Sequence, residues 1–192
     1  GGLVMNNNSI VYGNVYSNGN ISGWAATIDG DATVAGGGSP TLDQECNTNS
    51  GNFDFNATGR RDVAQRFTPT ISGPLTQISA YLKKTGSPSN ITVRVTTDNS
   101  GSPSSSQVGG SGTITSSSVT TSYGWINATF SSSPNLTAGT NYWLVLDTSS
   151  STSNYYSWAI DATDGCTNGT AKHASSWSSP PWTAINRDAN FR

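Results

Sequence analysis

The stretch SPNLTAGTNYWLVLD, at residues 133–147, contains the most apolar run of the chain. It begins with turn residues, Pro134-Asn135 and Ala138-Gly139, and continues into five bulky side chains without a polar interruption, Tyr142 to Leu146. A strand with one face in water alternates apolar and polar residues, whereas an unbroken run suits a strand that is buried on both faces. The stretch therefore predicts an all-β fold built around this strand.

The composition favours strands over helices and over disorder. Among 192 residues there are 31 Ser, 25 Thr and 19 Asn, and only 10% of the residues are charged. Disordered chains are poor in aromatic residues, but this chain has 6 Trp, 7 Tyr and 5 Phe. Thr and aromatic residues are enriched in strands, and the good helix formers are scarce here.

Charge and hydropathy exclude two classes of partner. The net charge is −2, so the chain lacks the basic surface that nucleic-acid binding requires. No apolar segment reaches the roughly 18 residues that a membrane-spanning helix needs. No signal peptide is visible, and the chain is expected to be a mature or trimmed extracellular region.

The two cysteines, Cys46 and Cys166, have no metal-binding spacing. Two separate buried thiols are one interpretation. We favour a disulfide formed in an oxidising compartment, because the Ser/Thr/Asn-rich and Lys-poor surface is typical of secreted proteins.

Residues 1–38 contain an internal repeat in which residues 10–19 align with residues 27–36, an offset of 17. Each copy has an apolar residue, a Gly, an Asn or Asp and a closing Gly, as the rungs of a β-solenoid do. Two rungs bury too little to stand alone, so this stem is expected to pack on the main domain, on preceding sequence or on a neighbouring subunit.

The rest of the chain divides into a linker, 39–51, and a domain, 52–192. Within the domain, apolar residues alternate at Ile78–Leu82, Ile91–Val95 and Ile126–Phe130, and turn residues recur every 8–12 positions. These intervals predict a jelly-roll-like antiparallel β-sandwich with a short N-terminal β-solenoid-like extension.

Several segments of the domain resemble one known family. They are AQRFTP at 64–69, GPLTQI at 73–78, YLKKTGSP at 81–88, VRVTTD at 93–98, LTAGTNYW at 136–143 and DANFR at 188–192. In this order they resemble the choice-of-anchor R domain, a β-sandwich family of bacterial surface-anchored proteins. The resemblance implies a fold and a cell-surface location, but no catalytic motif. The N-terminal stretch resembles bactofilin-like and pilin-like surface repeats.

No residue pattern indicates catalysis. The only histidine, His173, lies in an expected strand, and no Gly-x-Ser-x-Gly elbow is present. We expect no cofactor, apart from a structural Ca²⁺ held by the oxygen atoms of Asp161 and Asp164 as one interpretation. The other interpretation, which we favour, is that these residues form turns.

The tryptophans divide into two groups. Trp125, Trp143 and Trp158 lie within strand patterns, and we expect them in the core. Trp24, Trp177 and Trp182 lie among Gly, Ser and Pro residues. Exposed indole rings at such positions can stack on sugars, so these three are the candidate ligand-binding residues.

The sequence thus predicts a secreted, non-enzymatic domain at a bacterial cell surface. We expect the exposed part of a pilin-like or adhesive filament protein, acting in adhesion or assembly with other surface or filament subunits. The alternative is a carbohydrate-binding module of a larger secreted enzyme, whose partners are extracellular glycans.

Overall fold

The computed structural model describes residues 3–5, 10–13, 15–17, 21–23, 27–29, 32–34, 41–149, 151–163, 165–166, 169–179 and 181–192. The chain separates into two compact units, residues 1–41 and 42–192. Residues 42–51, which the sequence analysis assigned to a linker, belong to the second unit. Each unit is built from strands, so the all-β prediction is confirmed.

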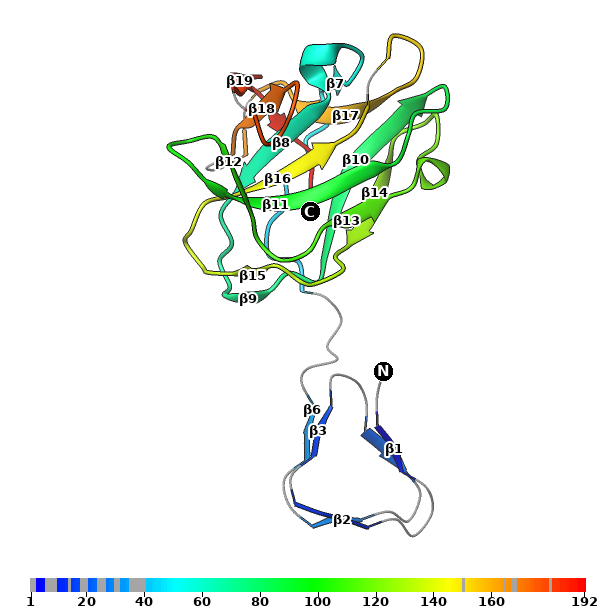
Figure 1. The fold of residues 1–192 in the computed structure, drawn as a ribbon, viewed down its shortest axis with the longest axis vertical. Helices are drawn as coiled ribbons and strands as arrows, with labels where there is room; N and C mark the ends of the chain where they lie inside the picture. The colour runs from blue at the N-terminus through cyan, green and yellow to red at the C-terminus, as the bar shows by residue number, and fades with distance from the viewer. Residues whose placement is uncertain are drawn as a thin grey trace. The chain divides into compact units, whose positions relative to one another are not determined.

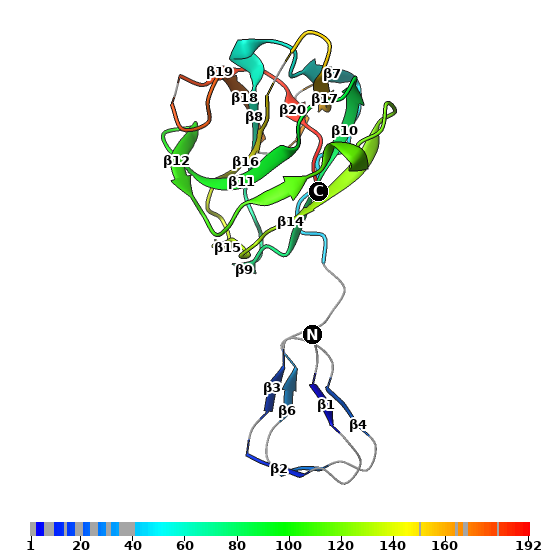
Figure 2. The same ribbon diagram turned by 45° about the vertical axis from the view of Figure 1, so that its right-hand side comes forward.

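The first unit consists of two rungs of a β-solenoid. The first rung contains β1 (Leu3–Met5), β2 (Ile10–Tyr12) and β3 (Val15–Ser17), and the second contains β4 (Ile21–Gly23), β5 (Thr27–Asp29) and β6 (Ala32–Val34). The pairs β1–β4, β2–β5 and β3–β6 are parallel, and they form the three sides visible in Figures 1 and 2.

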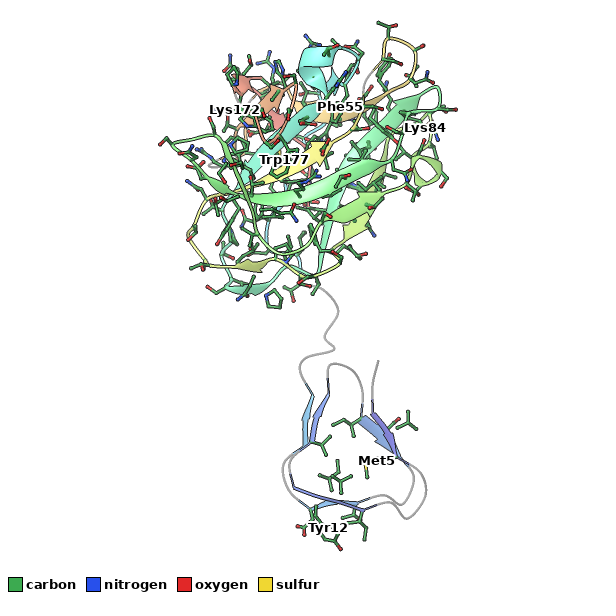
Figure 3. The ribbon with its side chains drawn as sticks, in the orientation of Figure 1. Met5, Tyr12, Phe55, Lys84, Lys172 and Trp177 are labelled. Atoms are coloured by element: carbon green, nitrogen blue, oxygen red, sulfur yellow. A yellow bond between two sulfur atoms is a disulfide. The ribbon has the colours of Figure 1, made fainter. Side chains whose placement is uncertain are left out.

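The register of these pairs confirms the repeat. Val11 lies opposite Ile28 and Val15 lies opposite Ala32, both at the predicted offset of 17. On the third side, Leu3 lies opposite Ile21, an offset of 18. The repeat is therefore one residue longer on this side than on the other two. Met5 points into the ring, whereas Tyr12 points away from it (Figure 3).

The second unit is a sandwich of two antiparallel sheets. One sheet contains β7 (Gly51–Asp54), β17 (Tyr155–Asp161), β10 (Gln77–Thr85) and β14 (Gly124–Thr129) in this spatial order, with β20 (Asp188–Ala189) also paired to β17. The other contains β13 (Gly112–Ile114), β11 (Ile91–Asp98), β16 (Tyr142–Asp147), β8 (Asp62–Phe67), β18 (Ala171–Ala174) and β19 (Thr183–Ala184), with β12 (Pro103–Gln107) also paired to β11.

The main strands follow the jelly-roll order. In chain order the eight main strands are β7, β8, β10, β11, β13, β14, β16 and β17. The first, third, sixth and eighth of them, β7, β10, β14 and β17, share one sheet, and the other four share the second. This alternation is that of two Greek keys folded on one another, so the predicted jelly-roll-like sandwich is confirmed. A short pair, β9 (Gly73–Pro74) with β15 (Asn135–Leu136), and two 3₁₀ turns, η1 (Thr58–Arg60) and η2 (Ser116–Ser118), complete the described elements.

The core lies between the two sheets, and β16 is its central strand. Leu144 and Leu146 of β16 face the core together with Phe55, Leu82 and Trp158, and all five side chains are fully buried. Trp143 and Val145 point to the opposite face of the same sheet and are also fully buried. The prediction that residues 142–146 are buried on both faces is therefore correct.

The predicted disulfide joins Cys46 to Cys166 across a sequence separation of 120 residues. Cys46 lies before β7 and exchanges two backbone hydrogen bonds with Phe191, at 2.8 and 2.9 Å. The backbone N–H of Cys166 donates to a carboxylate oxygen of Asp188, at 3.1 Å. The disulfide thus ties the start of the sandwich to the loop after β17 and to the segment that contains β20.

Candidate functional site

A polar groove on the outer face of the β11–β16–β8 sheet is the candidate site. It has a volume of about 520 Å³ and is closed along one side by residues 175–177, which follow β18. Its charged lining residues are Arg61, Asp62 and Asp147, and Trp177 supplies an indole ring. The remaining lining residues carry hydroxyl or amide groups: Asn90, Thr92, Thr148, Ser149, Ser175 and Ser176.

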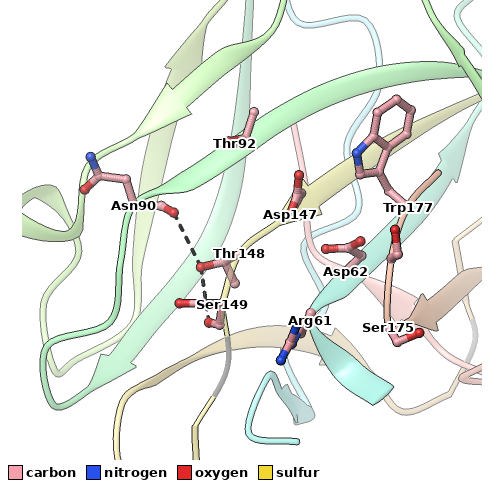
Figure 4. Close-up of a pocket in the computed structure, with 10 residues that line it drawn as sticks. Arg61, Asp62, Asn90, Thr92, Asp147, Thr148, Ser149, Ser175 and Trp177 are labelled. Atoms are coloured by element: carbon pink, nitrogen blue, oxygen red, sulfur yellow. Dashed lines mark hydrogen bonds between the residues drawn. The ribbon is translucent and has the colours of Figure 1, made fainter. Parts of the chain in front are cut away.

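The strand register brings the two acidic residues together. Asp62 of β8 lies directly opposite Asp147 of β16, because these strands pair antiparallel from Tyr142–Phe67 to Asp147–Asp62. On the other side of β16, Arg94 of β11 forms an ion pair with Asp147. Figure 4 shows the two carboxyl groups side by side, between Trp177 and Arg61.

The carboxyl group of Asp62 has a pKa above its usual range. Its side chain is only 2% exposed, and one of its oxygens, Oδ1, is buried without a hydrogen-bond partner. Burial raises the pKa of Asp62 to about 7, and the nearby charge of Asp147 and a hydrogen bond to it act in the same direction. The backbone N–H of Trp177 and the charge of Arg94 lower this pKa by smaller amounts. Two adjacent carboxyl groups that share one proton explain both the raised pKa and the unpartnered oxygen.

The carboxyl pair differs in spacing and surroundings from two known catalytic carboxyl pairs. Glycoside hydrolysis uses two carboxyl groups that are about 5 Å or more apart, with the sugar between them. Asp62 and Asp147 are hydrogen-bonded to one another, which leaves no such space. Aspartic proteases also use a carboxyl pair that shares a proton, but their pair is open to water and substrate. In this chain Asp62 is buried, and the guanidinium group of Arg94 forms an ion pair with the carboxylate of Asp147.

Trp177 and Trp182, two of the three candidate ligand-binding residues, lie on the same outer face as the groove. Both are partly buried and pack on Ala64, Trp143 and Val145. The guanidinium carbon of Arg94 lies 4.6 Å from the centre of the Trp177 ring and covers one of its faces. Trp177 lines the groove and Trp182 does not, so of these two rings only that of Trp177 can contact a ligand in the groove. The third candidate, Trp24, lies outside the described residues.

The pair Asp161 and Asp164, for which Ca²⁺ binding was one interpretation and turn formation the favoured one, is only half described, because Asp164 lies outside the described residues. Asp161 forms a turn: one oxygen accepts from the backbone N–H and the hydroxyl of Thr163, at 2.8 and 2.6 Å, and the other from the N–H of Gly165 at 3.1 Å. The hydrogen bonds from Thr163 lower the pKa of Asp161. Across the described part of the chain, no group of three or more His, Cys, Asp or Glu residues forms a metal site.

A second aromatic cluster, on the outer face of β10 and β14, was not predicted. Tyr81 lies 5.4 Å from Tyr123 and 5.0 Å from Trp125, measured between ring centres. Lys83 and Arg192 lie over the rings of Tyr123 and Trp125, at 4.8 and 4.6 Å from their centres. Burial raises the pKa of Tyr123 to about 12. Trp125 was expected in the core, and that expectation is wrong. Ala128, three residues further along β14, faces the core, so Trp125 lies on the opposite, outer face.

The sole histidine has a structural environment. Nδ1 of His173 lies 2.8 Å from the carbonyl oxygen of Gly59, and its ring centre lies 5.2 Å from that of Phe53. His173 is next to Ala174 on β18, the residue opposite Asp62, but its side chain points to the other face of the sheet. It therefore does not take part in the groove.

The groove residues come from distant parts of the sequence, and sequence reasoning missed all of them except Trp177. Asp62, Arg94 and Asp147 become neighbours only through the jelly-roll strand order. A comparison of the sequence with models of protein families and with curated proteins finds no match. The resemblance to the choice-of-anchor R domain thus depends on the quoted segments alone and stays a prediction.

Proposed function

We propose that this chain is a non-enzymatic extracellular surface domain, the exposed part of a pilin-like or adhesive filament protein that acts in adhesion or assembly. The single observation that carries this proposal is the two-rung solenoid, whose parallel strands pair in register on all three sides. The outer edges of both rungs are strand edges to which another rung of the same register can add.

The exposure of the apolar residues of the solenoid supports stacking between copies. Val11 and Ile28 face each other in adjacent rungs, and both are only partly buried. Val4 and Ile10 are 75% and 54% exposed. Solenoids generally need three or more rungs for stability. A second copy that adds its first rung to the second rung of this one supplies the missing neighbours, and the same contact repeated produces an open filament.

The second unit is compatible with an extracellular location. It carries a disulfide, a bond that persists in oxidising compartments. Among the residues that the structure describes, no helix has the length and apolar character to cross a membrane.

We predict that the chain associates head to tail through residues 1–41. In sedimentation velocity experiments, the average mass of the full chain should rise with protein concentration, and electron microscopy should show linear assemblies. A Val11→Asp/Ile28→Asp variant should stay monomeric, because two facing carboxylates inside the ring disrupt the rungs. A Tyr12→Ser/Thr27→Ser variant, changed on the outward positions of the same strands, should assemble as the parent does. A parent chain that remains monomeric at all concentrations contradicts the proposal.

A second candidate function, carbohydrate binding, is favoured by the groove beside Trp177. Its walls carry six hydroxyl or amide side chains, and its charged groups include carboxyl and guanidinium groups. Sugars bind through many hydrogen bonds combined with one apolar contact to a ring, and this lining offers both. Adhesion through a glycan is compatible with assembly through the solenoid, because the two use different units.

The two tryptophans of the outer face provide a matched test of this candidate. In a glycan array or a polysaccharide pull-down, Trp177→Ala should reduce retention about fivefold or more, since truncating an aromatic contact in a binding site costs about 1 kcal/mol or more. Trp182→Ala removes an indole that packs on the same three residues but does not line the groove, so it should retain binding. Equal loss in both variants would indicate a general effect on the fold and count against the groove.

A further inference from the structure

The charges of the groove do not balance. Arg94 and Asp147 form an ion pair, which is the ion pair found within the described ranges. Asp62 shares a proton with Asp147 and is therefore neutral below a pH of about 7. Arg61 lines the groove, is exposed, and has no carboxylate within ion-pair distance in the described part of the chain. The groove thus carries one uncompensated positive charge at mildly acidic pH.

Within the part of the chain that the structure describes, no other charged side chain around Asp62 offsets this charge. On β18, the residue opposite Asp62 is Ala174, and His173 points to the other face. The segment after β18 contributes the backbone N–H of Trp177. From β16 and β11 come Asp147 and Arg94, which neutralise each other.

We propose that the groove binds an acidic saccharide, one that carries a carboxylate or a sulfate, and that Arg61 pairs with this acidic group. The guanidinium group presents a planar fork of N–H donors that matches such oxyanions. The hydroxyl and amide groups of Asn90, Thr92 and Ser149 on the wall opposite Trp177 bond the ring hydroxyls, and the indole borders the apolar edge of the sugar (Figure 4). This inference rests on the carbohydrate-binding candidate above.

A sugar is preferred over a small inorganic anion because of the size and lining of the groove. A volume of about 520 Å³ lies within the range of pockets that enclose organic ligands. A bare anion uses only Arg61 and leaves the hydroxyl-lined wall without a partner.

The carboxyl pair gives this binding a pH signature. When Asp62 loses its proton, a second negative charge appears in the groove and repels an anionic ligand. Affinity for an acidic saccharide should therefore fall as the pH rises through about 7, whereas affinity for the matching neutral saccharide should change little.

The test uses the full chain with three probes: a tri-galacturonate, its fully methyl-esterified form, and a sulfated galactose oligosaccharide. Isothermal titration calorimetry at pH 5.5 and pH 8.5 gives the dissociation constants. At pH 5.5 an acidic probe should bind about tenfold or more tightly than the ester, because a hydrogen bond to a charged group is worth about 1.5–3 kcal/mol. The two acidic probes distinguish a carboxylate from a sulfate as the group that Arg61 prefers.

Two variants and one control assign the effect to residues. Arg61→Gln should abolish the preference for the acid over the ester. Asp62→Asn should keep the preference and lose its pH dependence. Arg60→Gln is the matched control: Arg60 is the adjacent arginine, but its guanidinium lies 5.0 Å over the ring of Phe53, outside the groove. It should behave as the parent.

The outcomes separate this inference from the function on which it rests. Equal binding of acid and ester, lost in Trp177→Ala, overturns the acidic-saccharide inference and retains the sugar-binding groove. An acid preference that survives in Arg61→Gln also overturns the inference. If none of the probes binds and a glycan array gives no positive spot, both the inference and the carbohydrate-binding candidate are wrong.

Discussion

Removing the disulfide should lower the free energy of unfolding of the second unit by about 4–5 kcal/mol. In the chain-entropy model, a cross-link that closes a loop of 120 residues restricts the unfolded chain by nearly this amount. The native contacts around the disulfide add to the effect, because Cys46 pairs with Phe191 and Cys166 bonds to Asp188. The net stability of most domains is 5–15 kcal/mol, so a loss of this size is a large part of the total.

The measurement is denaturant unfolding followed by near-ultraviolet circular dichroism, which reports the fully buried Trp143 and Trp158. The parent should unfold at a much lower denaturant concentration after reduction. A Cys46→Ala/Cys166→Ala variant should match the reduced parent and be insensitive to reductant. Alanine is preferred to serine, because Cys46 is buried and alanine adds no polar group there. Identical midpoints for the oxidised and reduced parent would show that the disulfide does not stabilise the fold.

The carboxyl pair should make the stability of the second unit fall as the pH rises from about 4 to about 7. The unfolded chain releases the Asp62 proton near pH 4, whereas the folded state retains it until a pH of about 7. Within this interval the folded state binds more protons than the unfolded state, so the free energy of unfolding decreases with pH. The stabilisation is complete below about pH 4 and is lost once the pH exceeds about 7. Its size is at most about 4 kcal/mol.

Asp62→Asn should remove this pH dependence. The amide is neutral at every pH and can donate a hydrogen bond to the Asp147 carboxylate, so the variant should exceed the parent in stability at pH 8. Unfolding midpoints at pH 4.5, 5.5, 7 and 8.5 test this. Asp43→Asn, at a carboxylate that accepts hydrogen bonds from Thr70 near the surface, is the control and should keep the parent's slope. A parent whose stability is constant over this range contradicts the shared proton.

The fold was largely predictable because its deciding signals are local. The uninterrupted run at 142–146 predicted a strand buried on both faces, and the alternation from Ile91 to Val95 predicted a strand with one apolar face, which is β11. The 17-residue repeat predicted the register of the solenoid. The short strands β9, β12 and β15 were missed, since segments of two to five residues are too short to show a periodic pattern.

The site was less predictable because it depends on topology. Asp62, Arg94 and Asp147 meet only because β8 and β11 both pair with β16, and no local pattern states which strands are neighbours. One signal was present in the sequence: in a chain with few charges, these residues occupy outward positions of otherwise apolar strands. Trp177 was selected as an aromatic residue outside the strand patterns, and it lines the groove, but its partial burial under Arg94 follows from the strand order.

The segment 188–191 has a consequence for how the protein is made. β20 pairs with β17, Phe191 bridges both Cys46 and Ala80, and the side chain of Gln65 bonds to Asp188 and Ala189 in the interior. A chain that emerges from a ribosome or an export channel in order of synthesis cannot close its sandwich until these residues are released. Folding of the second unit is therefore completed only after residue 191 has emerged, and a nascent chain halted before residue 188 exposes its apolar interior to chaperones and proteases.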